Sequence, residues 1–335
     1  MSYYPQLAER FSELFASIAN DRVLVLGHAR PDGDCIGSQL ALTRLLRTEG
    51  VDAVAYNADP IPDALSFLMA ETEIGKLSPD ALDGSPLIFV DCADQLRIGP
   101  KSSKLIERSH FLGNIDHHIS NTKFANFNLV ESSSAATCEI LAGLAFDFGW
   151  DVDPLTAQCL LTGIMTDTGR YSYAATSSRV FELSARLVDC GARSVVSAQS
   201  LYENEPLCRL ELLQRFLATL TTHCEGKLGT GFLLHQDFLD TGAKYEHTEG
   251  FVDYTRAIEG VRVGVYFEQK KTTVKGSFRA ETPDYRVDQL ARQFGGGGHA
   301  CAAAFSTEES LEEIRPKVFA AIEQRLTEVE QEKEI

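Results

Sequence analysis

The stretch FLGNIDHHIS, residues 111–120, joins a short apolar run to three polar side chains, Asp116, His117 and His118. The run Phe111–Ile115 has the length and composition of a buried strand. Open α/β sheets carry their chemistry at the carboxyl ends of such strands. The alternative is that the tripeptide only caps a helix or supplies hydrogen-bonded core histidines, without a chemical role. Three adjacent side chains that can all bind metal nevertheless favour a functional site.

Residues 27–38, GHARPDGDCIGS, repeat the pattern of an apolar strand followed by acidic and histidine side chains. They come directly after Val23–Leu26 and offer His28, Asp32 and Asp34. Because Asp32 and Asp34 are two residues apart in a turn, they could point at two neighbouring cations. An ordinary helix N-cap would explain Asp34 but would leave His28 without a role.

Two further carboxylates stand at the ends of apolar segments. Asp91 follows the apolar run Leu87–Val90, where it could also be a simple turn former. Asp167 ends an apolar helical stretch, a position that the helix dipole disfavours unless a positive partner lies nearby. The four segments together supply nitrogen and oxygen ligands without a thiolate, which suits Mn²⁺ better than a cysteine-rich zinc site. Two divalent cations about 3.5–4 Å apart can activate a water for in-line attack on phosphorus.

Residues 294–300, FGGGGHA, predict an anion-binding segment. Consecutive glycines allow close backbone approach, and their N–H groups can surround an anion, to which His299 could add a donor. A flexible loop is the alternative, but a helical pattern before the glycines and an apolar strand at Ala302–Phe305 favour order. Arg279, at the end of another predicted strand, could contact a phosphate or a base, or simply be exposed.

The order of apolar patterns predicts two domains. Short buried strands at 23–26, 51–56, 87–90 and 111–115 alternate with helical patterns at 4–19, 36–48, 135–148, 154–165 and 177–189. This alternation favours an α/β domain with a mainly parallel sheet flanked by helices. Longer strands at 227–235, 261–269 and 273–279, with helices at 286–294 and 308–330, predict a smaller α+β domain. We therefore expect a catalytic domain at 1–190, a linker at 191–210 and a substrate-binding domain at 211–335.

Bulk composition narrows the class of protein. With 31 Lys and Arg against 48 Asp and Glu, the net charge is −17, which argues against a generic double-stranded DNA binder. Bound cations and a few local arginines could still attract a phosphate. The 8 cysteines form no Cys-x-x-Cys pair, so we expect buried thiols rather than a disulfide framework or a structural zinc site. The absence of a long apolar run and of a signal-peptide pattern predicts a cytoplasmic protein without a membrane partner.

Taken together, these motifs resemble the DHH phosphoesterase superfamily, which is named after the tripeptide, and residues 211–335 resemble its DHHA1 domain. Size and domain order are similar to the bacterial nanoRNase/pAp-phosphatase group. The resemblance implies a larger N-terminal DHH domain, a smaller C-terminal DHHA1 domain and an active site in the cleft between them. One departure is that the glycine run is usually followed by Ala-Ala-Gly-Phe, whereas this chain has Ala302-Ala303-Ala304-Phe305. This departure bears on the local shape of the loop and not on the family.

The resemblance also implies roles for individual residues. It implies two manganese ions, for which Mg²⁺ or Co²⁺ could substitute: one bound by His28 and Asp32, the other by Asp34, His117 and Asp167, with Asp91 bridging them. It implies catalytic roles for Asp91, for His118 facing the substrate phosphate, and for Asp116 orienting a histidine ligand. It places the far end of a nucleotide against the following residues: Arg279, Gly296, Gly297, Gly298 and His299.

The implied activity is manganese-dependent, exonucleolytic hydrolysis of short oligoribonucleotides to nucleoside 5′-monophosphates. Dinucleotides such as pGpG and pApA would be substrates, and 3′-phosphoadenosine 5′-phosphate (pAp) would be converted to AMP. A phosphodiesterase for cyclic di-AMP or another cyclic dinucleotide would use the same metals. A manganese pyrophosphatase is disfavoured by the glycine-rich domain, and a long-strand exonuclease would need further nucleic-acid-binding domains. A non-catalytic nucleotide-binding regulator is disfavoured by the intact ligand set, and the oligomeric state stays open, with a homodimer among the choices.

Overall fold

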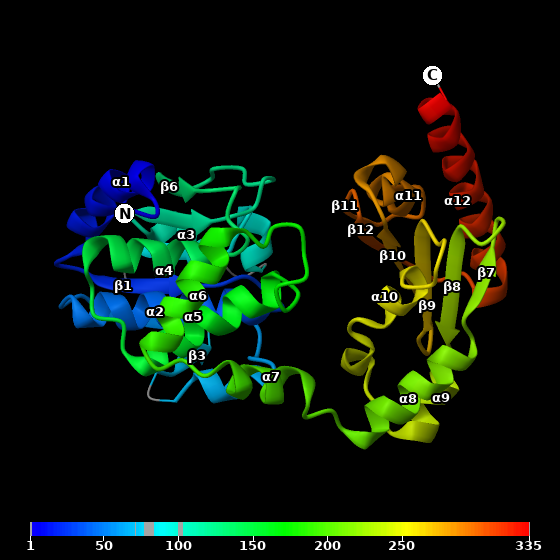
Figure 1. Cartoon of the computed structure of the whole chain (residues 1–335), viewed down its shortest axis with the longest axis horizontal. Coiled ribbons are helices and arrows are strands. Elements are labelled where there is room, and N and C mark those ends of the chain that lie inside the picture. Colours follow the sequence, from blue (N-terminus) through cyan, green and yellow to red (C-terminus); the bar gives the residue numbers. More distant parts are fainter. Residues whose placement is uncertain (1, 71, 77–83, 100–102, 335) are drawn as a thin grey trace. The chain divides into compact units, whose positions relative to one another are not determined.

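The computed structural model describes residues 2–70, 72–76, 84–99 and 103–334 (Figure 1). The chain divides into two compact units, Met1–Asn204 and Glu205–Ile335. The stretch expected as a linker, 191–210, contains helix α7 (Ser194–Tyr202) in the first unit and the start of α8 (Leu207–Ala218) in the second.

The first unit contains a parallel sheet of six strands in the order β3-β2-β1-β4-β5-β6. The expected strands are present as β1 (Arg22–Leu26), β2 (Asp52–Asn57), β4 (Leu87–Val90) and β5 (Leu112–Asp116). The edge strands β3 (Ile74–Lys76) and β6 (Phe127–Val130) were not expected. Both are short and mostly half-buried, so they lack the continuous apolar run of a central parallel strand.

Alternate residues of the central strands pack on opposite faces of this sheet, as the two-residue repeat of a strand requires. Val23 and Val25 belong to the larger core, which the main helices cover (Figure 1). Those helices are α1 (Pro5–Ile18), α2 (Gly33–Thr48), α4 (Thr137–Phe148), α5 (Pro154–Asp167) and α6 (Ser178–Asp189). Leu24 and Leu26 pack on the other face with Ile106 of α3 (Ser103–Arg108). Burial on both faces explains why β1 reads as an unbroken apolar run, and the predicted α/β class is confirmed.

The second unit contains a mixed sheet in the order β11-β12-β10-β9-β8-β7, in which only the β8–β9 pair is parallel. Its strands are β7 (Thr221–His223), β8 (Leu228–Leu233), β9 (Val263–Gln269), β10 (Val274–Ala280), β11 (Gly297–His299) and β12 (Ala302–Thr307). The core on one face includes α11 (Val287–Gln293) and α12 (Leu311–Glu334). The core on the other includes α8, α9 (His235–Thr241) and α10 (Phe251–Arg256). The predicted α+β class is confirmed.

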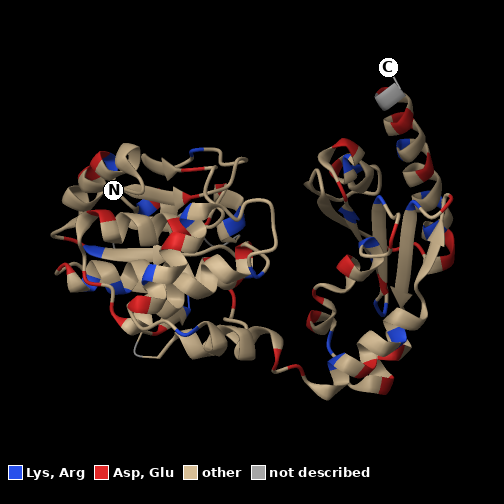
Figure 2. Cartoon of the chain, in the orientation of Figure 1, with Lys and Arg blue, Asp and Glu red and all other residues tan. Residues whose placement is uncertain are grey.

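The distribution of charged side chains agrees with the excess of acidic residues in the sequence. In the described part of the chain, Lys and Arg are scattered over both units among more numerous acidic residues, with no basic stripe along one element (Figure 2). None of the helices in the described ranges is long and apolar enough to cross a membrane. All 8 cysteines are free, and Cys35, Cys92, Cys138 and Cys159 are buried.

Candidate active site

Three neighbouring strands bring the candidate residues of the first unit to one edge of its sheet. His28 follows β1, Asp91 follows β4 and Asp116 is the last residue of β5. Because β1, β4 and β5 are adjacent and parallel, the segments that leave their carboxyl ends start side by side. The sequence pattern of strand-end acids and histidines therefore becomes one cluster in space.

The first turn of α2 supplies two carboxylates in different environments. Asp32 is the N-cap of α2, where it accepts a hydrogen bond from the Cys35 N–H at 3.0 Å, and its side chain is half exposed. Asp34 is fully buried and accepts hydrogen bonds from the N–H groups of Thr137 at 2.6 Å and Cys138 at 2.9 Å. These donors begin α4, so the positive end of that helix dipole faces the Asp34 carboxylate. Helix capping therefore accounts for Asp32 but leaves Asp34 as an inward-facing acid.

Asp91 lies at the centre of the cluster. Its Oδ2 is 3.3 Å from His28 Nε2, while its Oδ1 is 3.5 Å from His117 Nε2 and 3.5 Å from His118 Nδ1. Its backbone has a φ of 57°, a left-handed conformation that Asp tolerates better than most residues. The two carboxylate oxygens thus face different imidazoles.

Two imidazoles are held with their Nε2 atoms turned into the cluster. His28 Nδ1 lies 2.9 Å from the Ala29 carbonyl oxygen, and His117 Nδ1 lies 3.3 Å from that of Ser134. Each carbonyl favours a proton on Nδ1, which leaves the Nε2 lone pair available. Both Nε2 atoms are buried and have no hydrogen-bond partner within the described ranges. Buried polar atoms seldom lack partners, and a histidine fixed through its other nitrogen is the usual arrangement of a metal ligand.

Three groups of ligand atoms in the described residues could each hold a metal ion. They are His28, Cys35 and Asp91; Asp91, His117 and His118; and Asp34, His117 and Asp167. Asp32 also reaches the first group, with Oδ2 3.7 Å from His28 Nε2, and Asp167 Oδ2 is 3.3 Å from His117 Nε2. Asp91 and His117 are each shared by two groups. The residues present therefore fit a centre in which neighbouring cations share ligands.

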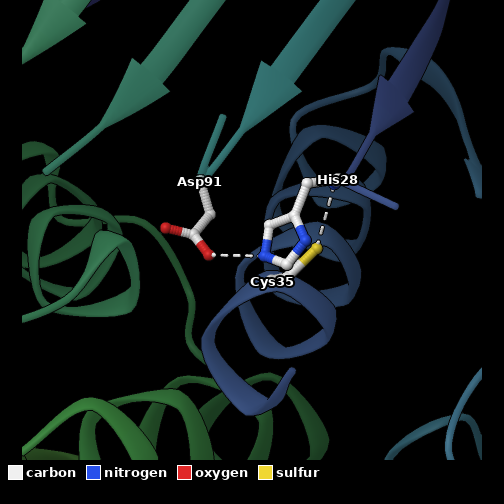
Figure 3. A group of neighbouring side chains, drawn as sticks. All are labelled: His28, Cys35 and Asp91. Atoms are coloured by element: carbon white, nitrogen blue, oxygen red, sulfur yellow. Dashed lines mark hydrogen bonds and ion pairs between the residues drawn. The ribbon is translucent and has the colours of Figure 1, made fainter. Parts of the chain in front are cut away.

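Cys35 lies beside the first of these groups. Figure 3 shows His28 between Asp91 and Cys35, whose Sγ accepts a hydrogen bond from the His28 backbone N–H at 3.2 Å. Burial raises the pKa of the Cys35 thiol to about 11. The thiol thus stays protonated at neutral pH and is better suited to fix the His28 backbone than to bind a cation.

The electrostatics of the cluster favour positive charge among its carboxylates. Burial acts to lower the pKa of His117, but Asp167 and Asp91 outweigh it and raise the pKa to about 12. Burial and the neighbouring charges of Asp91 and Asp167 raise the pKa of Asp34 well above its usual value. Burial is also the main cause that raises the pKa of Asp167 to about 6. Divalent cations would offset both the cost of burying these carboxylates and the repulsion between them.

Asp116 is bonded to a different histidine from the one expected. It is fully buried and accepts hydrogen bonds from His118 Nδ1 at 2.7 Å and from Asn121 Nδ2 at 2.6 Å. A histidine that binds metal was expected in this place, but His117 is oriented by the Ser134 carbonyl instead. The reason is local: alternate residues of an extended chain point the same way, which brings residues 116 and 118 together.

Two residues of the cluster were missed by the sequence reasoning. Thr137 Oγ1 donates to Asp91 Oδ1 at 3.3 Å, and Arg97 Nη1 lies 3.2 Å from His118 Nε2. Arg97 could have been suspected, because it follows Asp91 closely on the same strand-end segment. Thr137 carried no such signal, since a Thr at the start of a helix is commonplace.

The glycine segment of the second unit is more ordered than a loop. Residues Gly297–His299 form β11 and pair with β12, Gly297 opposite Ala304 and His299 opposite Ala302. A Cβ on Gly296 would lie 2.1 Å from the Ala304 carbonyl oxygen, and one on Gly298 would lie 2.5 Å from that of Ala302. A Cβ on Gly297 would meet nothing within 4 Å. Two glycines are thus required by packing, whereas Gly297 has an open side.

The alanine that replaces the usual glycine after this run leaves β12 intact. Ala304 pairs with Gly297 on one side and with Ser277 on the other, within a strand that continues to Thr307. The position therefore lies in an extended strand that any residue can occupy.

Arg279 shares this part of the sheet. It pairs with Ala302, which pairs in turn with His299, so Arg279 and His299 flank the same residue of β12. The Arg279 Nε donates to Asp253 Oδ1 at 3.0 Å. The candidate substrate-binding residues of the second unit therefore lie on adjacent strands, and an ion pair holds Arg279.

Comparison with known proteins identifies the family. Residues 22–164 match the DHH family, N-terminal domain, and residues 231–328 match the DHHA1 domain. A bifunctional oligoribonuclease and PAP phosphatase NrnA of Thermus thermophilus is 32% identical over 310 residues, which cover 91% of this chain and 90% of the relative. The chain belongs to the DHH family. Asp116, His117 and His118 are its name-giving residues, and the predicted membership is confirmed.

Two further proteins are similar to this chain over most of its length. A bifunctional oligoribonuclease and PAP phosphatase NrnA of Bacillus subtilis is 25% identical, covering 88% of this chain and 92% of the relative. The crystal structure of an exopolyphosphatase-related protein from Bacteroides fragilis has a TM-score of 0.90 at 22% identity, covering 96% of this chain and 97% of that one. At that identity the structural likeness speaks for the fold alone.

Proposed function

We propose that this DHH protein is a metal-dependent hydrolase that cuts short oligoribonucleotides, including dinucleotides, exonucleolytically to nucleoside 5′-monophosphates. The same centre would remove the 3′-phosphate of pAp to give AMP. The observation that carries the proposal is the cluster around Asp91, where two buried Nε2 atoms without hydrogen-bond partners in the described ranges face its two carboxylate oxygens. The relatives named as oligoribonucleases and PAP phosphatases support the substrate class.

The proposed cofactor is a pair of Mn²⁺ ions, for which Mg²⁺ or Co²⁺ could substitute. His28 and Asp32 would hold one ion, Asp34, His117 and Asp167 the other, and Asp91 would hold both. Bound there, such cations lower the pKa of a water and offset negative charge at phosphorus. The imidazole and carboxylate groups that make up most of the cluster's donors support a hard or borderline cation over a thiophilic one.

The protein's own side chains would orient and stabilise the reacting phosphate. His118, held by the buried Asp116, would face the substrate phosphate. The N–H groups that begin α4 keep the Asp34 carboxylate turned inward. In the second unit, Arg279, Gly296, Gly297, Gly298 and His299 would bind the far part of the nucleotide, and the open side of Gly297 supports close approach of a ligand to the backbone. A cytoplasmic location and a homodimer remain predictions.

One experiment tests the substrate class. The purified chain with Mn²⁺ would be offered a labelled RNA series from dinucleotide to long oligomer, together with pAp and cyclic di-AMP. We expect fastest turnover of the shortest RNAs, release of nucleoside 5′-monophosphates and conversion of pAp to AMP. A strong preference for long RNA, or for cyclic di-AMP over linear dinucleotides, would contradict the proposal. Protein treated with a chelator is the control, and manganese bound per chain is measured in parallel.

A further inference from the structure

Arg97 places a guanidinium at the edge of the cluster. Its Nη1 lies 3.2 Å from His118 Nε2, while the other nitrogen of that ring is bonded to Asp116. Because His118 Nδ1 is also 3.5 Å from Asp91 Oδ1, a short chain of contacts joins Arg97 to the central carboxylate. The guanidinium is therefore next to the proposed reaction centre and separated from the carboxylates by an imidazole.

The segment after β4 is built to hold Arg97 in this position. Residues Gln95–Ile98 form a short 3₁₀ helix whose N-cap, Asp94, accepts hydrogen bonds from the N–H groups of Leu96 at 2.7 Å and Arg97 at 3.2 Å. The Arg97 carbonyl accepts a hydrogen bond from the Ala29 N–H at 2.7 Å, which ties this segment to the one that carries His28. The Arg97 backbone is thus fixed at both of its polar groups.

The charge of Arg97 is not cancelled locally. Across the described ranges, the guanidinium forms no ion pair with a carboxylate, although the cluster beside it is rich in aspartates. Arg is the side chain best suited to oxyanions, because its planar fork can donate two parallel hydrogen bonds to phosphate. An arginine that forms no ion pair with a carboxylate in the described ranges, and that lies beside a proposed phosphoester site, is well placed for an anionic substrate.

The position is open to a ligand. The neighbours of Arg97 and His118 in the chain, Leu96 and Ile119, are 89% and 92% exposed. His118 and Arg97 are themselves partly exposed, whereas Asp91 and Asp116 are buried. The pair thus lies at the rim of the cluster, with the carboxylates beneath it.

We propose that Arg97 is a further catalytic residue, whose guanidinium donates hydrogen bonds to the non-bridging oxygens of the phosphate under attack, next to His118. This inference rests on the proposed phosphoester hydrolysis. In that reaction water forms the new P–O bond while the bond to the leaving oxygen breaks. Arg97 keeps all its protons and stabilises the charge that builds up on the non-bridging oxygens.

The test compares Arg97→Gln and Arg97→Lys with Arg22→Gln as the matched control. Arg22 lies at the amino end of β1, at the opposite end of the strand from His28. Removing one preorganised donor to a developing oxyanion costs about 10²–10³-fold in turnover. We expect a loss of this size in kcat/KM for Arg97→Gln, partial recovery in Arg97→Lys, and wild-type values in the control. Manganese bound per chain should stay unchanged, and AMP should bind the Arg97→Gln variant more weakly in calorimetry.

A chain that carries His118→Asn distinguishes direct contact between Arg97 and the phosphate from an effect of Arg97 through His118 alone. If Arg97 touches the phosphate, Arg97→Gln lowers activity further in a His118→Asn chain; if it acts only through His118, the two changes together cost no more than His118→Asn alone. That second result, or an Arg97→Gln chain with wild-type kcat/KM, would overturn the inference.

The choice of substrate keeps this inference distinct from the proposed function. All variants are assayed on bis(p-nitrophenyl) phosphate, a generic phosphodiester, as well as on a dinucleotide. If the chain cleaves the generic ester but no RNA or pAp, the proposed substrates are wrong while the role of Arg97 is still tested. If Arg97→Gln matches wild type on both esters, the role of Arg97 fails while the proposed function stands.

Discussion

The acidic cluster of the first unit and the glycine segment of the second differ in what carries their chemistry. Around Asp91, side chains from separate strand ends converge, and their charges shift one another's pKa values. Around Gly297, the candidate groups include backbone N–H donors, and close strand packing leaves no room for a Cβ at Gly296 or Gly298. Removal of one charge should therefore disable the cluster around Asp91. Addition of one carbon atom should disable the glycine segment.

The largest effect is expected from Asp91→Asn, which keeps the size of the side chain and tolerates the left-handed backbone at this position. Because both oxygens of Asp91 face imidazoles of the cluster, the change should lower kcat by more than about 10³-fold. This decrease is larger than the one expected from the loss of a single oxyanion donor. Manganese bound per chain, measured by atomic absorption, should fall as well. Asp52→Asn, an exposed carboxylate at the start of β2, is the control. Retention of both activity and metal would refute a shared-ligand centre.

A smaller loss is expected from Asp116→Asn. Asp116 accepts a hydrogen bond from His118 and belongs to none of the three candidate ligand groups, so the change should lower kcat about 10–100-fold, as for other carboxylates that orient a functional histidine. Metal content should stay at the wild-type value, with Asp189→Asn on the surface of α6 as the control. Loss of manganese in Asp116→Asn would instead mean that Asp116 is itself a ligand.

Adding one methyl group should have different effects at Gly296 and at Gly297. In Gly296→Ala, the new Cβ would clash with the Ala304 carbonyl oxygen, so we expect the unfolding free energy to fall by about 1–3 kcal/mol. In Gly297→Ala, the Cβ meets open space, so stability should change by less than about 0.5 kcal/mol. If a ligand approaches that open side, KM for a dinucleotide should nevertheless rise about tenfold, equivalent to about 1.4 kcal/mol. Denaturant unfolding and steady-state kinetics measure the unfolding free energy and KM of both variants. Equal losses of stability in the two variants would contradict the packing difference.

The smallest effect is expected from Ala304→Gly, which restores the usual residue of the family at this position. A glycine inside β12 should lower the unfolding free energy of the chain by about 0.5–1 kcal/mol and leave KM unchanged. Thermal unfolding and kinetics on a dinucleotide would measure both quantities. A marked gain in substrate affinity would show instead that Ala304 distorts the glycine segment.

The central strands were predictable because burial on both faces leaves a clear trace in the sequence. β4 and, after the exposed Arg22, β1 are continuous apolar runs, and their ends were expected to within one residue. β3, β6 and β7 are short and half-exposed, so their pairing depends on neighbours that the local sequence does not reveal. The bounds of the helices in the expected linker could not be predicted, because polar residues and Pro206 dominate that stretch.

The candidate ligands were predictable from the same logic, since acids and histidines at strand ends share one edge of a parallel sheet. The carbonyls of Ala29 and Ser134, which orient His28 and His117, could not be predicted, because any residue type can supply a carbonyl. The partner of Asp116 was misjudged for a related reason: residue types suggest which groups are ligands but not which ring each carboxylate reaches. The proposed roles of all these residues await the variants above.

The spread of the ligand set along the chain has a consequence for the lifetime of the folded protein. His28, Asp91, His117 and Asp167 come from segments far apart in sequence, and they meet only when the first unit is folded. A cation that binds this arrangement but not the unfolded chain adds about 2.7 kcal/mol to folding stability at a hundredfold excess over its Kd. Supply of the cation would then set how long each molecule survives as well as how fast it works, and scarcity would leave a chain more readily unfolded and degraded.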